Sequence, residues 1–180
     1  MPCEGGVVPP PTRLLTVDDA AALTELVRAN RSFLAPWDPV RDEDWFTVEG
    51  QDAAIREILA EHDRGTALPH VVLDDEGEIA GRINLGRIAR GPFLSAGLGY
   101  WVAADRNGRG LASAAVGHLK DIAFRELGLH RIEAGTLVHN AASQRVLERN
   151  GFARFGLAPR YLRIAGSWQD HVMFQVLNET

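Results

Sequence analysis

The chain is poor in cysteine and has no long apolar run. Its one cysteine, Cys3, allows neither an internal disulfide nor a cysteine-based zinc site, so we expect a protein of a reducing compartment. No apolar segment approaches the ~18 residues that a membrane span needs. No apolar stretch follows Met1 in the manner of a secretory signal, so we expect a cytoplasmic protein with no membrane partner.

The sequence also has no excess of basic charge. Its 19 Lys and Arg against 24 Asp and Glu give a net charge of -5, which argues against a nucleic-acid binder that relies on a broad basic surface. A basic protein tail remains compatible as a substrate, because acidic patches attract such tails. The six histidines are scattered, with no H-x-x-x-H spacing and no cysteine partner, so we expect no metal site.

What is present suits one globular domain. A chain of 180 residues with 46% apolar residues can bury about 70% of its unfolded surface. The first twelve residues, MPCEGGVVPPPT, are rich in Pro and Gly, so we expect residues 1–12 to form a flexible arm before a single domain over residues 13–180.

Hydrophobic periodicity predicts the order strand, two helices, three strands, helix, strand, helix, two strands. This mixture of strand runs and strand–helix units predicts an α/β (α+β) protein with one mixed sheet and helices on both of its faces. The first helix is expected after the capping residues 16–19, with an apolar face up to Asn30. The other helices are expected at 50–63, 111–127 and 140–149, and the strands at 13–17, 69–73, 78–88, 95–102, 130–138, 152–164 and 168–177.

A loop with two glycines joins the strand at 95–102 to the next helix. Gly108 and Gly110 would let an anion approach the unpaired N–H groups of the helix start, and Arg106 and Arg109 could add charge-assisted contacts. The same glycines are equally compatible with a tight turn and no ligand. The spacing matches neither a G-x-G-x-x-G fingerprint nor a P-loop.

Asn140 and Ser143 mark the start of the helix at 140–149. Asn140 is a good N-cap, and capping alone would explain it. In a functional interpretation this helix end faces the same cleft as the glycine loop. The strands at 95–102 and 130–138 would then be neighbours that are splayed to admit a ligand.

Four motifs together resemble the GNAT acetyltransferases: Tyr100-Trp101-Val102, Gly108-Arg109-Gly110-Leu111-Ala112, Asn140-x-x-Ser143 and Leu147-Glu148-Arg149-Asn150-Gly151-Phe152. The resemblance implies a mostly antiparallel mixed sheet and acetyl-CoA as co-substrate. It also implies that the glycine loop binds the coenzyme pyrophosphate through backbone amides, while the splayed strands hold the pantetheine arm. The residues expected to bind the cofactor are Tyr100, Trp101, Val102, Asn107, Gly108, Arg109, Gly110, Leu111, Ala112, Asn140 and Ser143.

Three further segments resemble the ribosomal-protein-alanine acetyltransferases of the RimJ type: Asn30–Asp42, Arg90–Phe93 and Tyr161–Val172. This closer resemblance covers residues 13 to 175. It implies that the acceptor is the N-terminal α-amino group of a protein, with Trp37, Arg41, Tyr161 and Trp168 on the acceptor side. Ordinary packing would explain each of these four residues as well. A homodimer is compatible with this resemblance.

The chain departs from the family at the general base. Many GNAT enzymes carry a glutamate at places that match Gly97 and Gly135 here. An α-amino group has a pKa of about 7.7–8.0, whereas lysine is near 10.4, so a missing base costs little for an N-terminal substrate and much for lysine. A water chain that ends at Asp170, His139 or Glu133 could remove the proton.

Ser143 is expected to position or protonate the departing thiolate, with Tyr161 as the second choice. The catalytic candidates are therefore Ser143, Tyr161 and Asp170, with the N–H of Val102 as oxyanion donor. Three alternatives stay open. They are a small-molecule amine acetyltransferase, a non-catalytic acyl-CoA-binding regulator and a plain nucleotide-binding module.

Overall fold

The computed structural model describes residues 10–179. Most of the predicted arm, residues 1–9, lies outside the described residues, and Thr12 already begins the first strand. The elements in chain order are β1 Thr12–Leu14, η1 Val17–Asp19, α1 Ala20–Ala29, α2 Arg31–Leu34, η2 Glu43–Phe46, α3 Val48–Asp63, β2 Leu68–Leu73, β3 Ile79–Ala89, β4 Ser95–Val102, η3 Ala104–Arg106, α4 Leu111–Arg125, β5 Arg131–Leu137, α5 Ala141–Arg149, β6 Ala153–Ile164 and β7 Ser167–Leu177.

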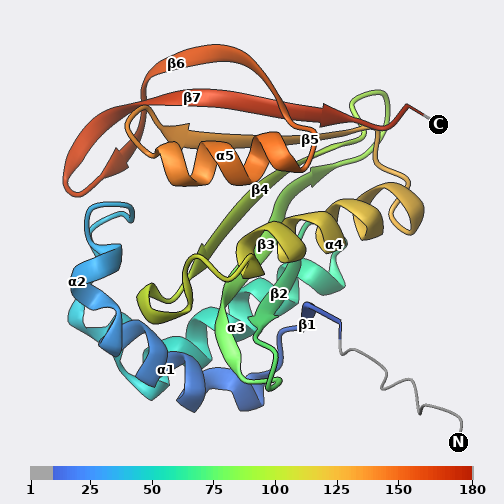
Figure 1. Ribbon diagram of the computed structural model, residues 1–180. Helices are drawn as coiled ribbons and strands as arrows, with labels where there is room; N and C mark the ends of the chain where they lie inside the picture. The colour runs from blue at the N-terminus through green and yellow to red at the C-terminus, as the bar shows by residue number, and fades with distance from the viewer. Residues whose placement is uncertain (1–9, 180) are drawn as a thin grey trace, which may run out of the picture.

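The strands form one seven-stranded sheet in the order β1-β2-β3-β4-β5-β7-β6 (Figure 1). All neighbours pair antiparallel except β4 and β5, which run parallel. The predicted mixed, mostly antiparallel sheet is confirmed. Hairpins join β2 to β3, β3 to β4 and β6 to β7, longer connections join β1 to β2 and β5 to β7, and the helix α4 makes the crossover that the parallel pair requires.

Helices cover both faces of this sheet. On β2, Val72 packs into the large cluster that contains Leu119 of α4 and Leu147 of α5. The adjacent Val71 packs with Leu23 of α1 and Ile55 of α3 on the opposite face. Successive strand residues point to opposite faces, so each apolar strand residue serves one of the two layers.

Two differences from the sequence prediction have local causes. The first strand ends at Leu14 rather than at residue 17, because the Asp19 carboxylate accepts from the Thr16 amide (2.9 Å) and turns the chain into η1. The helix α3 begins two residues early, because the Thr47 hydroxyl caps it by accepting from the Gly50 amide (3.0 Å). Among the described residues, no helix is long and apolar enough to cross a bilayer.

The packing of β3 against β4 gives a test of the sheet centre. A Cβ at Gly81 would collide with the carbonyl oxygen of Trp101, whereas a Cβ at Gly99 would meet nothing within 4 Å. We expect Gly81→Ala to lower the free energy of unfolding by about 1–3 kcal/mol, because the strands must shift apart. Gly99→Ala is the matched control and should leave it nearly unchanged. Urea denaturation of both variants measures this, and equal stabilities would contradict the register described here.

The buried side chain of His70 makes the fold sensitive to acid. Its Nδ1 lies 2.8 Å from the Thr12 hydroxyl, which also lies 2.7 Å from Nδ1 of His118 on α4. Burial, together with the charges of His118 and His62, lowers the pKa of His70 to about 4. The unfolded chain therefore binds this proton first as pH falls below 6.5.

We expect this stabilisation to be complete above pH 6.5 and to be lost as pH falls toward 4. The total loss should be about 3 kcal/mol, since each unit of pKa shift corresponds to about 1.4 kcal/mol. His70→Asn, which keeps a polar atom near Thr12 but does not titrate, should flatten the stability profile in this window. His130→Asn on the surface is the control. An unchanged profile for His70→Asn would refute the assignment.

Candidate active site

The centre of the candidate site is the gap between β4 and β5. The two strands pair only at Ser95 with Arg131, Ala96 with Ile132 and Gly97 with Glu133. Beyond these pairs the strands part, as the sequence analysis predicted. The Ala103 amide donates to the Ala80 carbonyl on β3 (2.8 Å), so the N–H of Val102, one residue earlier, points to the opposite side, into the gap.

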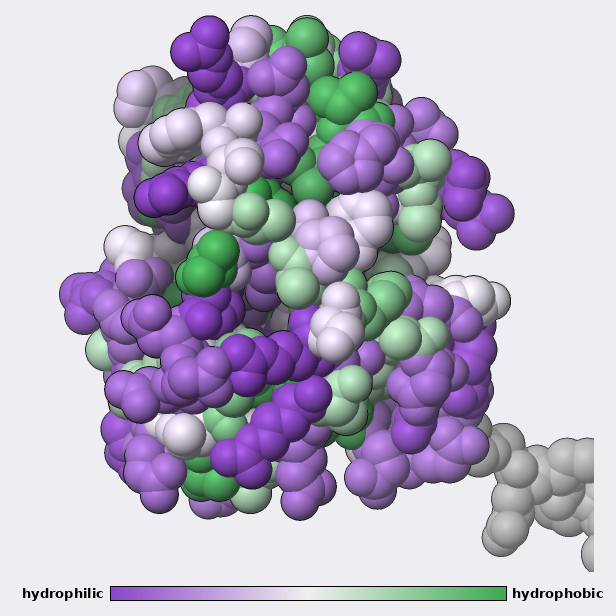
Figure 2. Space-filling view, turned by 90° about the vertical axis from the view of Figure 1, so that its left-hand side faces the viewer, coloured by the Kyte–Doolittle hydropathy of each residue, from purple (hydrophilic) through white to green (hydrophobic). Residues whose placement is uncertain are grey.

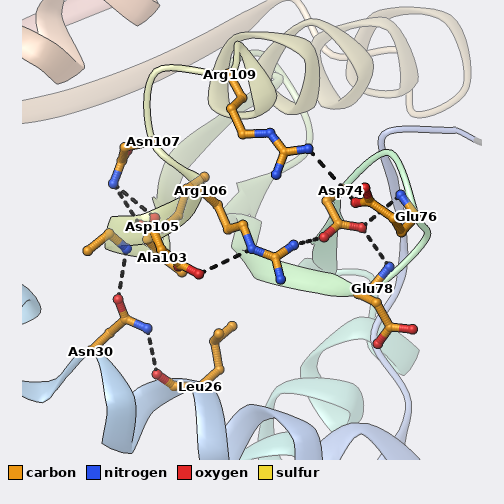
Figure 3. Close-up of polar contacts among 12 residues, drawn as sticks. Leu26, Asn30, Asp74, Glu76, Glu78, Ala103, Asp105, Arg106, Asn107 and Arg109 are labelled. Carbon is orange, nitrogen blue, oxygen red and sulfur yellow. Dashed lines mark hydrogen bonds and ion pairs between the residues drawn. The ribbon is translucent and has the colours of Figure 1, made fainter.

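The loop after β4 is held in place by Asn30, which follows α1, and by Asp74, which follows β2 (Figure 3). The side-chain oxygen of Asn30 (Oδ1) accepts from the backbone amide of Ala104 (2.8 Å). Its side-chain amide nitrogen (Nδ2) donates to the backbone carbonyl of Leu26 (2.9 Å). The Asn107 amide group donates to the Ala103 carbonyl (3.0 Å). Asn107 therefore shapes the loop at its entrance.

The glycines of this loop expose the start of α4. Gly108 and Gly110 have φ values of 77° and 83°, in the left-handed region that favours glycine. Gly110 is the N-cap of α4 and provides no side-chain cap, so the first amides of the helix stay available. They border a cavity of about 520 Å³, which we call the loop cavity. Its lining includes Val102, Asn107, Gly108, Gly110, Leu111, Ala112 and Ser113.

The arginines of the loop have partners in the chain. Arg106 forms an ion pair with Asp74, whose Oδ1 also accepts from the amides of Glu76 and Glu78 at 3.0 and 2.9 Å. Arg109 reaches Asp75 at 3.1 Å and does not line the loop cavity (Figure 3). The structure thus turns the predicted cofactor residue Arg109 toward the β2–β3 turn.

Two basic residues that the sequence analysis did not single out line the loop cavity from the other side. Arg145 and Arg149 lie one turn apart on α5 and border the cavity with Val146. Their spacing of four residues on one helix face was the available signal. Together with Arg106, they give this cavity a positive rim.

The start of α5 carries the predicted pair Asn140 and Ser143. The Asn140 side chain accepts from the Ser143 amide (3.1 Å), which confirms the N-cap. The Ser143 hydroxyl lies 2.8 Å from the hydroxyl of Tyr100, a partner that the sequence did not reveal. Burial outweighs the opposing effect of the hydrogen bond with Ser143 and raises the pKa of Tyr100 to about 12. The phenol therefore keeps its proton at neutral pH.

A second cavity of about 580 Å³ lies over β3, β4 and β5, between the α3 helix and the β6–β7 end of the sheet. We call it the sheet cavity. Its lining includes Asp38, Arg41, Arg82, Asn84 and His171. The two cavities meet at residues that line both of them: Leu34, Trp37, Tyr100, Trp101, Asn140 and Ser143.

The segment after α2 closes one side of the sheet cavity. The Ala165 amide at the β6–β7 turn donates to the Asp38 carbonyl (3.0 Å), which joins two segments far apart in the sequence. Arg41 lies over the Trp45 ring, with its guanidinium carbon 4.1 Å from the ring centroid. On this side of the molecule the surface is hollowed across its middle, where apolar residues gather (Figure 2).

The other predicted residues are only partly brought together. Trp37 and Arg41 line the sheet cavity, whereas Tyr161 packs behind its wall, with its ring 5.4 Å from that of His171. Trp168 is 62% exposed and lies outside both cavities. Asp170 also lies outside them, with its Oδ1 accepting from the Arg160 amide (2.8 Å).

The positions of the absent glutamates are occupied by other side chains. A Cβ at Gly97 would lie 2.9 Å from the Arg87 guanidinium, and one at Gly135 would lie 3.3 Å from the Met173 sulfur. Glu133 is ion-paired with Arg131 at 3.1 Å, and the ring of His139 lies 5.5 Å from that of Trp37. The sequence analysis missed Asp38, a carboxylate that lines the sheet cavity and whose pKa is raised by burial.

No group of three or more His, Cys, Asp or Glu residues is arranged to hold a metal ion in the part of the chain that the structure describes. The candidate site as a whole consists of two cavities that meet beside an unpaired edge of β4. Its chemical groups there are backbone amides, a serine hydroxyl and a protonated phenol. This is suited to group transfer between two substrates that enter from different sides.

Comparison with known sequences gives close relatives over nearly the whole chain. The protein called probable N-acetyltransferase YjcK of Bacillus subtilis (strain 168) is 36% identical over 167 residues, which cover 92% of each chain. The [ribosomal protein uS5]-alanine N-acetyltransferase of Escherichia coli (strain K12) is 38% identical over 162 residues, 89% of this chain and 84% of the relative.

Solved structures agree in fold. The ribosomal-protein-S5-alanine acetyltransferase of Vibrio fischeri superposes with a TM-score of 0.89 at 34% identity, over 93% of this chain and 92% of the other. Mycobacterium smegmatis RimJ, solved in complex with CoA-disulfide, also gives 0.89, at 36% identity over 93% and 81%. The family model of the acetyltransferase (GNAT) domain matches residues 12–153. The resemblance seen in the sequence is thereby confirmed, and the chain belongs to the GNAT family of N-acetyltransferases.

Proposed function

We propose that this chain transfers the acetyl group of acetyl-CoA to the N-terminal α-amino group of a protein. The observation that carries the proposal is the meeting of the loop cavity and the sheet cavity beside the unpaired edge of β4. The donor occupies the loop cavity, the acceptor enters through the sheet cavity, and the acetyl group passes at the residues common to both.

The loop cavity fits the chemistry of a coenzyme A. The open amides at the start of α4 suit a pyrophosphate, because a helix N-terminus carries unpaired donors and a partial positive charge. Arg106, Arg145 and Arg149 supply positive charge on its rim. The gap between β4 and β5 offers strand-like backbone partners to an amide-containing arm, and the Val102 N–H is the donor for the developing oxyanion.

In the reaction, the amine nitrogen attacks the thioester carbon, so a C–N bond forms, the C–S bond breaks and the amine loses one proton. Asp38 lines the sheet cavity and is the carboxylate that we assign to receive this proton, directly or through water. Ser143 donates a proton to the departing sulfur, Tyr100 restores the serine proton through their 2.8 Å contact, and the phenolate left on Tyr100 takes its proton back from solvent water. A thiol pKa near 8.5 makes this protonation helpful but not essential.

Two lines of support favour an α-amine as acceptor. An α-amino group is partly neutral at physiological pH, so it needs only a weak base, and this chain has glycine at positions 97 and 135, which match the glutamate positions of many GNAT enzymes. The relative from Escherichia coli, 38% identical, is called an N-acetyltransferase of the alanine of ribosomal protein uS5.

The acceptor class can be tested directly. Purified protein, acetyl-CoA and a panel of peptides with free N-terminal Ala, Ser or Met should give peptides heavier by one acetyl group in mass spectrometry. N-terminally blocked peptides that carry lysine are the control and should stay unmodified. Exclusive acetylation of small amines such as polyamines or amino sugars would contradict the protein acceptor and favour a small-molecule enzyme.

The role of Ser143 gives a second test. We expect Ser143→Ala to lower kcat by roughly ten- to a hundredfold with little change in the Kd of acetyl-CoA, because it removes a proton donor used as the thiolate leaves. Ser167→Ala, at the exposed first residue of β7, is the control and should behave as the wild type. A steady-state assay of thiol release measures this. An unaffected kcat would remove Ser143 from the mechanism.

The basic rim gives a third test, by binding alone. The double substitution Arg145→Gln and Arg149→Gln should weaken binding of coenzyme A by about tenfold or more, and less at high salt, because a charge-assisted contact to phosphate is lost. Arg125→Gln, on the exposed end of α4 and outside both cavities, is the control. Calorimetric titration that shows equal affinities would disprove the rim as a phosphate contact.

A further inference from the structure

The sheet cavity contains polar side-chain atoms that have no hydrogen-bond partner in the chain. Among the described residues, six buried side-chain atoms make no hydrogen bond; one of them, on Asp74, is ion-paired with Arg106, and four belong to residues of this cavity. They are Arg41 Nε, Arg82 Nε, Asn84 Oδ1 and Thr136 Oγ1. Buried polar atoms are nearly always hydrogen-bonded in native proteins, so their concentration around one cavity points to a ligand.

Arg82 is the most unusual member of this group. The residue is only 9% exposed, and its side chain forms no ion pair or hydrogen bond with any other described residue. Burial lowers the pKa of its guanidinium, and the charge of Arg41 lowers it further. A buried charge without a counter-charge is costly, so an anionic ligand would relieve a real penalty at this place.

The strand register places Arg82 beside the junction of the two cavities. Arg82 on β3 is opposite Trp101 on β4, and Asn84 is opposite Gly99. Trp101 lines both cavities, and Gly99 adds no side chain over β4, so the floor between Asn84 and the gap stays open. Paired residues on neighbouring strands lie about 5 Å apart, so Arg82 is one strand away from the place of transfer.

The carboxylates of the cavity leave Arg82 free. Asp38 Oδ2 lies 3.8 Å from a guanidinium nitrogen of Arg41, so the ion-pair partner of Asp38 is Arg41 and not Arg82. Glu57 and Glu61 lie on α3, at the opposite wall, and neither comes within ion-pair distance of Arg82. Their negative charge would repel a doubly charged phosphate more than a single carboxylate.

We propose that Arg82, supported by Arg41 and Asn84, forms an anion subsite that binds a carboxylate side chain in the first residues of the acceptor. The subsite belongs to the acceptor and not to the cofactor, because none of the three residues lines the loop cavity. Each residue of an extended peptide spans roughly 3.3–3.6 Å. With the α-amino group at the place of transfer, a side chain at position 2 or 3 of the acceptor can therefore reach Arg82 on the neighbouring strand β3. The acceptor is then a protein that begins with a small residue followed closely by Glu or Asp. This inference rests on the proposed function and adds its substrate class.

A pair of isosteric peptides tests the subsite. Peptides that begin with Ala and carry Glu or Gln at position 2 or 3 differ only in charge, and a third set carries the Glu at position 7. We expect kcat/KM to be about tenfold higher for the Glu peptide than for the Gln peptide at position 2 or 3, since one charge-assisted contact is gained. At position 7 the two peptides should have equal kcat/KM. Arg82→Gln should reduce the preference to about one while leaving the Gln peptide within about threefold of wild type.

Two further variants separate recognition from folding. Arg87→Gln changes an arginine on the same strand that lines neither cavity and should keep the Glu preference. Arg82→Met, of similar size but uncharged, should lose the preference without lowering the Tm, because it removes a buried unpaired charge. A large loss of Tm in both Arg82 variants would show that Arg82 supports the fold and would overturn the subsite.

Binding measured without acetyl-CoA separates this inference from the proposed function. Tryptophan fluorescence titration should show tighter binding of the Glu peptide than of the Gln peptide, and Arg82→Gln should equalise them. If the peptides bind in this way but are never acetylated, the proposed function fails and the subsite stands. If peptides are acetylated with no Glu preference, or if binding of the two is equal or absent, the subsite is wrong.

Discussion

The early end of the β4–β5 ladder is the constraint on which the site depends. After Gly97 and Glu133 the two parallel strands no longer pair, so their backbone groups face a gap. Backbone N–H and C=O groups need hydrogen-bond partners, and the unpaired ones of these strands face the place where both cavities meet. The Val102 N–H points into this gap because the next amide, that of Ala103, is committed to β3. If β4 and β5 paired along their whole length, the two cavities would not meet at this edge and the Val102 N–H would not be available as a donor.

The loop that follows β4 shows a division of labour between side chains and backbone. Asn30 and Asn107 hold carbonyl and amide groups of the loop, and Asp74 binds Arg106. These contacts fix the loop without using the amides at the start of α4. Arginine side chains of this loop thus hold it in place, while the backbone at the start of α4 and residues of α5 line the loop cavity. Arg109 is the clear case, since Asp75 is its partner.

The sheet cavity differs from the general-base pattern that the family resemblance implied. Side chains of Arg87 and Met173 lie against Gly97 and Gly135, and the carboxylate of Asp38 lines the cavity from the loop after α2. Arg82 faces the same space from β3. Under the proposed function, the chemistry of transfer depends on the sheet edge, whereas acceptor preference depends on residues that can vary without disturbing that edge.

Local patterns in the sequence were sufficient for the elements and for part of the site. The strand Ser95–Val102, the glycine loop and the cap of Asn140 follow from spacing and capping chemistry, which act over a few residues. Only the tertiary structure decided which side chains face a cavity. It turned Asp170 to the opposite side of β7 from His171, paired Arg109 with Asp75, set Tyr100 against Ser143 and left Arg82 buried without a partner. Asp170 is the shorter-range case, since its partner Arg160 lies ten residues earlier on β6. The pairings of Arg109 and Tyr100 depend on contacts between segments dozens of residues apart, and the period of a strand or helix carries no information about them.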